Sequence, residues 1–293
     1  ALINDAADRV TVAAGKIKNP VALYNTTRDV SFTRPGIIMP QSIYLDRIRN
    51  FFLAAPGVSL RGEHDRESVG ATWQLSALRT ETDEEELEHA FLLGDWPGKF
   101  EGRNSWLGQV MFDWQGGRWK AGLSLGDVNM RYRISPAPFG PVTNGDVKLK
   151  PRFLSLQMNA EDWTLTAEYG LTAIDNRAFV VPLRYDTEGW YVQSTYRFAP
   201  RWQAWLRYEQ IYFDKDDKSG SNLIPFGVQP FINYHKDWVL GVRFDPTPAW
   251  ALSLEWHTVK GAAILSPQDN PGLPNSRFTR NWDMLLLQAA YRF

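Results

Sequence analysis

Apolar and polar residues alternate with a period of two along most of the chain from residue 57 onward, a pattern typical of β-strands. In the last segment, Leu285, Leu287, Ala289, Tyr291 and Phe293 share one face, and the residues between them share the other. The pattern predicts about twelve strands, at residues 8–18, 57–64, 68–80, 104–115, 118–133, 150–159, 162–173, 187–198, 201–213, 235–245, 249–261 and 281–293.

Aromatic residues mark the ends of the apolar face in strand after strand, as Trp250 and Trp256 do around Leu252 and Leu254. Two aromatic girdles are expected where a transmembrane barrel meets both membrane interfaces. Strands of about 10 residues cross a bilayer at a tilt of about 45°. The opposite face carries charged residues, and burying these unpaired in a dry core would cost several kcal/mol each. We therefore expect an all-β, transmembrane antiparallel β-barrel, with residues 1–293 forming one domain.

The predicted connections alternate in length. Short turns are expected at 64–68, 115–118, 159–162, 199–201 and 245–248, and long links at 19–56, 79–103, 134–149, 173–187, 215–234 and 262–280. Outer-membrane barrels have short periplasmic turns and longer extracellular loops. This alternation predicts a location in the bacterial outer membrane, in contact with its lipid and lipopolysaccharide. The strand at 118–133 changes its alternation near Gly126, which predicts a β-bulge.

Composition narrows the function further. The 293 residues include 13 Trp, 16 Phe and 11 Tyr, too many aromatic residues for a disordered chain. A formal charge of −1 argues against a nucleic-acid partner, which would favour a basic surface. The absence of cysteine excludes disulfides and cysteine-ligated zinc, and no cofactor is expected.

The region between residues 15 and 64 resembles a segment of Gram-negative outer-membrane porins, the general diffusion and phosphate-selective-like trimeric porins. The matching stretches are Gly15–Pro20, Leu23–Val30, Phe32–Pro35, Pro40–Tyr44 and Asp46–Arg47. The resemblance implies a homotrimer and a water-filled channel. The terminal Phe293, with Tyr291 on its face, is also similar to the C-terminal signal that the barrel-assembly machinery recognises.

The resemblance also suggests a role for the link at 19–56. In sixteen-stranded porins, the loop between the fifth and sixth strands folds into the lumen and forms the constriction. The link at 19–56 joins the first and second predicted strands, so it would correspond to that loop if four N-terminal strands are missing. Ala1–Ile3, before a turn at Asn4–Asp8, would then end a preceding strand. The alternatives are a twelve-stranded barrel with a short N-terminal tail, and an extracellular lid pinned by salt bridges.

A channel selects solutes by its radius and by the charges that line it. In the link, the candidate pore residues are Arg28, Asp29, Arg34, Asp46, Arg47 and Arg49. On the strands, alternation predicts that Arg61, Glu63, Lys120, Arg131, Arg133, Arg197, Arg207 and Arg243 face the lumen. Cations exceed anions among these residues, which predicts a mild anion preference.

The expected function is passive diffusion of small hydrophilic solutes and ions. The alternatives are a channel specific for phosphate, sugars or organic acids, a purely structural barrel, a soluble β-sandwich and an outer-membrane barrel enzyme. The chain has only four histidines. It lacks a serine–histidine arrangement like that of outer-membrane phospholipases, and no His-x3-His or Glu-x2-His constellation lies on one predicted strand face. We therefore expect neither catalysis nor a metal site.

Overall fold

The computed structural model describes residues 3–4, 7–83, 86–94, 96–135, 140–265 and 278–293. Within these residues, fourteen strands form one antiparallel sheet, in which thirteen follow each other in chain order and β5 pairs only with β7. The strands are β1 (Ile3–Asn4), β2 (Asp8–Lys18), β3 (Ala54–Arg66), β4 (Val69–Arg79), β5 (Gly98–Gly102), β6 (Asn104–Trp114), β7 (Trp119–Ile134), β8 (Gly145–Asn159), β9 (Trp163–Asn176), β10 (Leu183–Ala199), β11 (Trp202–Tyr212), β12 (Tyr234–Thr247), β13 (Trp250–Gly261) and β14 (Asn281–Tyr291).

Short helices occupy some of the links between the strands. They are η1 (Ser31–Thr33), η2 (Asp46–Ile48), α1 (Arg49–Leu53), α2 (Glu86–Leu92), η3 (Ser221–Phe226) and η4 (Pro230–Asn233). No helix in the described part of the chain is long and apolar enough to cross a membrane.

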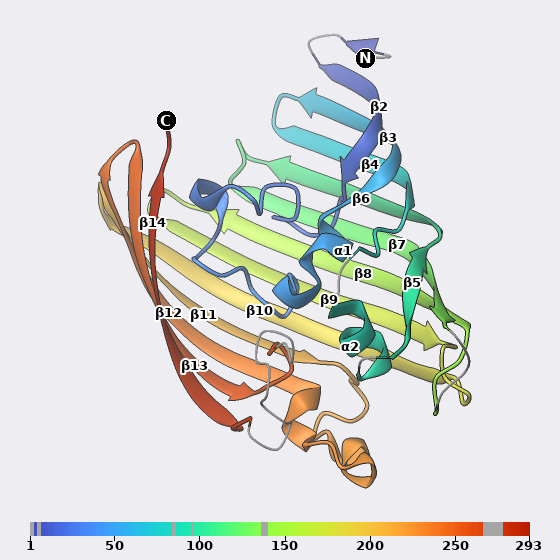
Figure 1. Cartoon of the computed structure of the whole chain (residues 1–293). Coiled ribbons are helices and arrows are strands. Elements are labelled where there is room, and N and C mark those ends of the chain that lie inside the picture. Colours follow the sequence, from blue (N-terminus) through green and yellow to red (C-terminus); the bar gives the residue numbers. More distant parts are fainter. Residues whose placement is uncertain (1–2, 5–6, 84–85, 95, 136–139, 266–277) are drawn as a thin grey trace.

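All twelve predicted strands are present, and the structure adds the short strands β1 and β5. The sheet curves strongly, with one concave and one convex side (Figure 1). β1 and β14 end the row and do not pair with each other, so the described strands form an open wall. The two ends of the chain lie at the same edge of this wall (Figure 1).

The two edges of the wall differ as predicted. One edge, called here the short-turn edge, carries the tight connections between β3 and β4, β6 and β7, β8 and β9, β10 and β11, and β12 and β13. In one of these turns Gly116 and Gly117 have φ of 66° and 80°, which a side chain would disfavour. The other edge, called here the long-link edge, carries the long connections.

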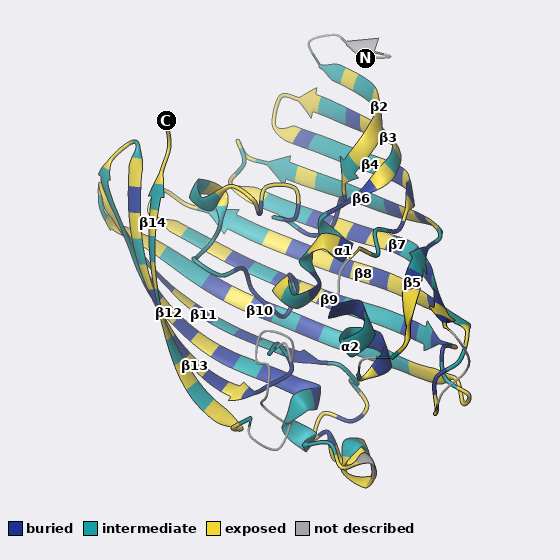
Figure 2. Cartoon of the chain, in the orientation of Figure 1, coloured by how far each residue is buried: buried dark blue, intermediate teal, exposed yellow. Residues whose placement is uncertain are grey.

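Burial alternates along the strands as bands that are visible in Figure 2. The convex face is apolar and exposed. It includes Leu206, Leu240, Leu254 and Leu287, with exposures of 50%, 61%, 38% and 79%. Polar side chains on the concave face contact the link between β2 and β3 instead, as described below. The alternation predicted from the sequence is therefore present, with its apolar side outward.

Aromatic residues form two rows on the convex face. On three strands the rows are six residues apart: Trp163 and Tyr169, Trp202 and Tyr208, and Trp250 and Trp256. Six residues correspond to about 20 Å along a strand. Rings on neighbouring strands contact each other within each row. Trp202 and Phe244 are stacked with centroids 4.4 Å apart, and Tyr208 and Trp238 are tilted with centroids 4.6 Å apart. The predicted girdles are therefore continuous across adjacent strands.

The predicted bulge near Gly126 is wrong. β7 pairs with β8 in one register on both sides of this glycine, at Leu125 with Arg152 and at Val128 with Leu149. The ladder is interrupted opposite Pro151, which has no N–H to donate. Register shifts are observed in other strands, between Tyr196 and Ala199 and between Phe244 and Thr247 near the short-turn edge. On the other side of β7, the segment from β5 to β6 contains one extra residue between the pairs Gly102–Met130 and Trp106–Asp127.

An apolar core fills the concave side toward the long-link edge. The far half of β7 contributes Val128, Met130 and Tyr132, and these pack in one cluster with Phe51 of α1 and Phe91 of α2. In this part of β7, apolar side chains point to the concave side and charged side chains point to the convex side. Between the two aromatic rows the arrangement is the reverse. This reversal, and not a bulge, explains the change in the sequence pattern.

Candidate functional site

The link between β2 and β3, residues 19–53 and called here the inner loop, lies on the concave side of the wall (Figure 1). Its backbone N–H groups donate to wall side chains on several strands. The N–H of Ala22 donates to Ser124 on β7 at 3.1 Å, and that of Ser42 donates to Glu209 on β11 at 2.8 Å. The N–H of Ile38 donates to Glu255 on β13 at 3.1 Å. The loop therefore runs inside the wall, where the resemblance had suggested.

Glu168 on β9 anchors the first part of the inner loop. It is 2% exposed and accepts four hydrogen bonds. Two donors come from the loop, the N–H of Leu23 at 2.8 Å and the hydroxyl of Tyr44 at 2.6 Å. Two come from the wall, Ser155 at 2.6 Å and Tyr191 at 2.7 Å. A carboxylate can accept this many bonds, and they compensate for its loss of water.

Tyr44 acts as a neutral donor at this anchor, and the hydroxyl of Tyr24 accepts from Gln157 on β8 at 2.7 Å. Burial raises the pKa of Tyr24 to about 12 and raises that of Tyr44 well above its ordinary value. The hydroxyl of Tyr44 also accepts from the N–H of Tyr24 at 3.0 Å. Because both phenols keep their protons at physiological pH, Tyr44 holds the loop at the carboxylate and Tyr24 holds it at Gln157 without adding charge.

Arg207 and Glu255 anchor the middle of the inner loop. Arg207 is 0% exposed, and its Nη1 donates to the carbonyl of Ile38 and to Gln193, both at 3.3 Å. Glu255 accepts from Trp205 at 3.1 Å as well as from Ile38. The prediction that Arg207 lines the lumen is therefore wrong in one respect. Its side chain points inward, but the inner loop covers it.

Two glycines permit this close approach of loop and wall. A Cβ on Gly36 in the loop would lie 2.2 Å from Oε1 of Glu255. A Cβ on Gly189 in β10 would lie 2.1 Å from the carbonyl oxygen of Ser42. Real Cβ contacts are not this short. Another residue at Gly189 would displace the backbone of the loop, and another residue at Gly36 would displace either the loop or the carboxylate of Glu255.

The arginines of the inner loop mainly brace it. Arg28 has a side-chain exposure of 1% and donates to Asp46 at 2.6 Å. Arg34 donates to the carbonyl of Ile37 at 3.2 Å. Arg47 donates to the carbonyl of Ala263 at 2.9 Å, and burial lowers its pKa. These predicted pore residues therefore hold the loop in shape, and Arg28 does not line the lumen because it is buried.

Other charged residues of the loop remain accessible. Asp29 forms ion pairs with Lys18 at 2.9 Å and with Arg49. The hydrogen bond from Lys18 is the main reason that the pKa of Asp29 lies below its ordinary value. The side chain of Asp46 is 47% exposed. Asp29, Asp46 and Arg49 are therefore the loop residues that can act on ions in water.

Several predicted wall residues face inward as expected. Arg61 and Glu63 lie on the concave face of β3 and form an ion pair at 3.0 Å, with side-chain exposures of 54% and 39%. Lys120 lies inward on β7 beside Asp113 of β6. Arg243 lies over the ring of Phe32 in the inner loop, 5.2 Å from its centroid. Arg197 is exposed near the short-turn edge.

The prediction that Arg131 and Arg133 face the lumen is wrong. Both lie on the convex side of β7, where Arg131 pairs with Asp146 at 2.6 Å and Arg133 pairs with Glu101 at 2.8 Å. The prediction assumed a bulge near Gly126 that would reverse the faces of the strand. The register is unbroken, so both arginines stay outside the lumen, near the long-link edge.

At the other end of the chain, β14 places Tyr291 on the convex face against Trp250, with ring centroids 4.9 Å apart. Phe293 follows the strand and is fully exposed. Their role as an insertion signal stays a prediction.

The partners of the carboxylates on the concave face were not predicted from the sequence. His257 bonds to Asp237 at 2.6 Å and approaches Glu255 at 3.4 Å, and His235 lies 3.9 Å from Asp237. All are buried on the concave face of β12 and β13. His235 and Asp237 are two residues apart on β12, and Glu255 and His257 are two residues apart on β13, so each pair shares one strand face. The spacings His-x3-His and Glu-x2-His do not include such pairs.

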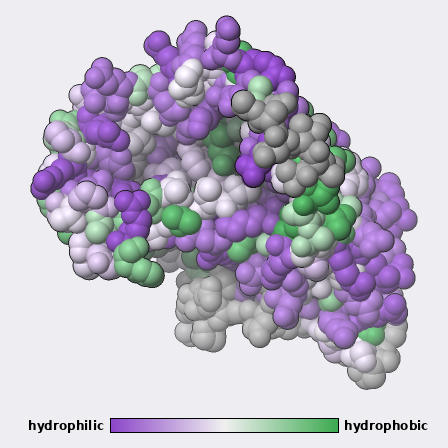
Figure 3. Space-filling model, turned by 90° about the horizontal axis from the view of Figure 1, so that it is seen from above, coloured by the Kyte–Doolittle hydropathy of each residue, from purple (hydrophilic) through white to green (hydrophobic). Residues whose placement is uncertain are grey.

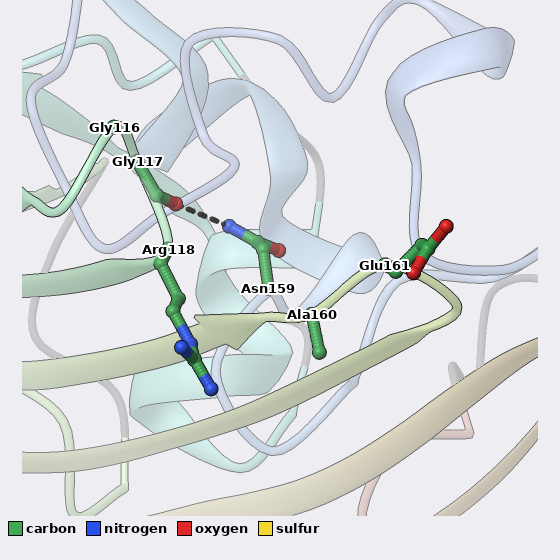
Figure 4. Close-up of a pocket in the computed structure, with 6 residues that line it drawn as sticks. All are labelled: Gly116, Gly117, Arg118, Asn159, Ala160 and Glu161. Atoms are coloured by element: carbon green, nitrogen blue, oxygen red, sulfur yellow. Dashed lines mark hydrogen bonds between the residues drawn. The ribbon is translucent and has the colours of Figure 1, made fainter.

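A separate surface pocket lies between two turns of the short-turn edge (Figure 4). Gly116, Gly117, Arg118, Asn159, Ala160 and Glu161 line it. Asn159 donates across it to the carbonyl of Gly117 at 2.9 Å. None of the six residues belongs to the inner loop or its anchors. Seen from above, the molecule is hollowed and its visible face is mostly hydrophilic (Figure 3). We therefore place the functional site on the concave side, at the inner loop and its anchors.

No protein-family model matches the chain, and no curated protein matches it in sequence. Solved structures that share its fold include the following three. The outer membrane channel DcaP of Acinetobacter baumannii is 10% identical, with a TM-score of 0.62 over 96% of this chain and 71% of that chain. An anion-selective porin from Comamonas acidovorans is 12% identical, with a TM-score of 0.52 over 85% of this chain and 63% of that chain. OmpT of Vibrio cholerae is 12% identical, with a TM-score of 0.55 over 96% of this chain and 75% of that chain. The fold is thus that of Gram-negative outer-membrane porins.

Proposed function

We propose that the chain forms a water-filled channel in the bacterial outer membrane, through which small hydrophilic solutes and ions diffuse passively. The observation that carries the proposal is the arrangement of the two faces. The convex face is apolar between two aromatic rows, as lipid contact requires, and the concave face presents charged residues around an inner loop. The three similar structures, two described as a channel and a porin, support the same function.

The inner loop is proposed to form the constriction. It is stiffened by its anchors at Glu168 and Arg207, and it carries exposed charges at Asp29, Asp46 and Arg49. Its position on the concave side favours this role over an extracellular lid. The short-turn edge would face the periplasm, and the long-link edge the outside.

The wall is proposed to be part of a sixteen-stranded barrel. An exposed strand edge leaves N–H and C=O groups unpaired, which the bilayer does not tolerate. The row of described strands has such edges at β1 and β14. The greater length of the similar chains supports additional strands. A homotrimer, contacts with lipopolysaccharide and delivery by the barrel-assembly machinery complete the proposal.

A mild anion preference is proposed from the accessible inward cations. In water, one unit charge acts on an ion about 10 Å away with about 0.4 kcal/mol, which changes its local concentration about twofold. Salt weakens this effect, so reversal potentials are best measured in planar bilayers at low ionic strength. The removal of each positive charge lowers the local anion concentration about twofold and raises that of cations about twofold, so the double variant Arg61→Gln, Lys120→Gln should lower the ratio of anion to cation permeability about sixteenfold.

The matched control is the double variant Arg131→Gln, Arg133→Gln, which removes the same charge from the convex face. It should leave the permeability ratio unchanged. Wild-type protein that does not conduct would contradict the channel, and equal effects of the two double variants would contradict selection by inward charges. Conductance that saturates with phosphate, a sugar or an organic acid would favour the substrate-specific alternative.

A further inference from the structure

Three ionisable side chains meet inside the wall beneath the inner loop. His235 and Asp237 are two residues apart on β12, and Glu209 on β11 is the cross-strand partner of Asp237. One nitrogen or oxygen atom of each lies within 4.8 Å of the others. Their exposures are 0%, 2% and 1%, respectively, so water does not compensate their polar atoms.

These side chains retain unused ligand atoms that face one another. Both ring nitrogens of His235, Oε1 of Glu209 and Oδ1 of Asp237 are buried and lack hydrogen-bond partners. The nearest approach of His235 to Asp237, 3.9 Å between Nε2 and Oδ2, is too long for a hydrogen bond. Buried polar groups are almost always paired, so unsatisfied atoms in such a cluster indicate a missing ligand.

The second oxygen of each carboxylate is held in place. Oε2 of Glu209 accepts from the N–H of Ser42 at 2.8 Å, and Oδ2 of Asp237 bonds to His257 at 2.6 Å. Partners of this kind orient the ligands of metal sites. Both carboxylates are therefore fixed in place beside the imidazole of His235.

The charges also favour a cation. Glu209, Asp237 and Glu255 lie close together, and the guanidinium of Arg207 is their neighbour, with Nε 3.3 Å from Oε1 of Glu209. Nε of Arg207 and Oε1 of Glu209 are close enough for an ion pair, but they do not form a hydrogen bond. Three carboxylates face one guanidinium and the imidazole of His257, which bonds to Asp237 and Glu255, so at least one negative charge is left uncompensated. Like charges directly opposite each other on paired strands destabilise a sheet, and a divalent cation would remove this repulsion.

We propose that Glu209, His235 and Asp237 bind one divalent cation of the zinc class. One imidazole and two carboxylates suit zinc, cobalt or manganese, whereas calcium and magnesium prefer oxygen alone. Tetrahedral zinc bonds of about 2.0–2.2 Å separate two ligand atoms by about 3.4 Å, so side-chain atoms that now lie within 4.8 Å of one another must close by up to about 1.4 Å on binding. Because Glu209 also holds Ser42, the metal fastens the inner loop to the wall.

The test uses the detergent-solubilised protein, stripped with a chelator and then incubated with zinc or cobalt alone. Mass spectrometry of bound metal should find one equivalent per chain, and zinc should raise the midpoint of thermal unfolding. His235→Ala and Asp237→Asn should each weaken zinc binding at least about 100-fold, more than the loss of an outer partner. Asp237→Asn keeps the size of the side chain, so it tests the site even if His235→Ala misfolds.

His64→Ala is the matched control, because His64 pairs with Asp8 near the short-turn edge, away from the site. It should bind zinc as the wild type does. Wild-type protein that binds none of zinc, cobalt or manganese stoichiometrically would overturn the proposal, and so would undiminished binding by both site variants. Binding is measured without conduction, so this result is independent of the proposed channel function.

Discussion

The close fit of the inner loop against β10 predicts the effect of a single added methyl group. In Gly189→Ala, the new Cβ would lie 2.1 Å from the carbonyl oxygen of Ser42 and 3.0 Å from its carbon. Ordinary contact begins at 3.4 Å, so the loop must move about 1.3 Å away from the wall. The clashing atoms are backbone, and no flexible side chain can absorb this shift.

The displacement has two energetic consequences. Overpacking of this kind costs about 1–3 kcal/mol. The hydrogen bond from Ser42 to the charged Glu209, 2.8 Å long, would weaken as well, and such bonds contribute about 1.5–3 kcal/mol. Because the wall lies behind the loop, the loop can only move toward the centre of the lumen. We therefore expect a narrower channel.

Single-channel conductance in planar bilayers measures this directly, with thermal unfolding as the second measurement. Gly189→Ala should lower both the conductance and the unfolding midpoint, and Gly189→Val should lower them further. Gly108→Ala is the matched control, because its Cβ would point outward and meet its nearest atom, Cδ1 of Leu75, at an ordinary 3.6 Å. If both variants of Gly189 conduct like the control, the inner loop does not limit the channel.

Three further predictions concern the loop and the open edges. Arg28→Met should lower the free energy of unfolding by about 2 kcal/mol, measured in urea, without changing the reversal potential, because the buried guanidinium braces the loop. The pKa of Asp29 is lowered in the folded state, so its contribution to the free energy of unfolding is fully present above the unfolded pKa of about 3.9 and is lost as pH falls below it. In Asp29→Asn, the free energy of unfolding should therefore decrease less as pH falls. Cysteines in place of Thr11 and Gln288 should not form a disulfide if further strands separate β2 from β14. Cysteines at the paired positions Ser253 and Gln288 should form one and serve as the control. Rapid oxidation of the Thr11–Gln288 pair would exclude the sixteen-stranded barrel.

Much of the fold could be predicted because lipid and water act on alternate residues of a strand. The alternation of apolar and polar residues alone predicts that Leu254 and Trp256 point outward, and the structure places both on the convex face. The prediction failed at Arg131 and Arg133 because it assumed that apolar residues always face lipid. Near the long-link edge, Met130 faces a core built by α2, and the pattern reverses.

The site was harder to predict than the wall. Inward orientation of Arg207 followed from alternation, but its burial depends on the path of the inner loop, which carries no periodicity. The cluster of Glu209, His235 and Asp237 depends on the pairing of β11 with β12. That register becomes visible only when two strands far apart in sequence are aligned.

The central claim is that one face of each strand contacts lipid and the other contacts the aqueous interior. β14 is suited to a test of this claim, because Leu285, Leu286, Leu287 and Gln288 alternate between the convex and concave faces. Three of these four residues are leucine, so the orientation changes while the side chain stays nearly the same. The chain has no cysteine, so single cysteines at these four positions can carry a spin label in liposomes without interference. We predict that labels at 285 and 287 are relaxed by oxygen dissolved in lipid, and those at 286 and 288 by a water-soluble nickel complex. Equal access of the nickel complex to all four positions would contradict the account.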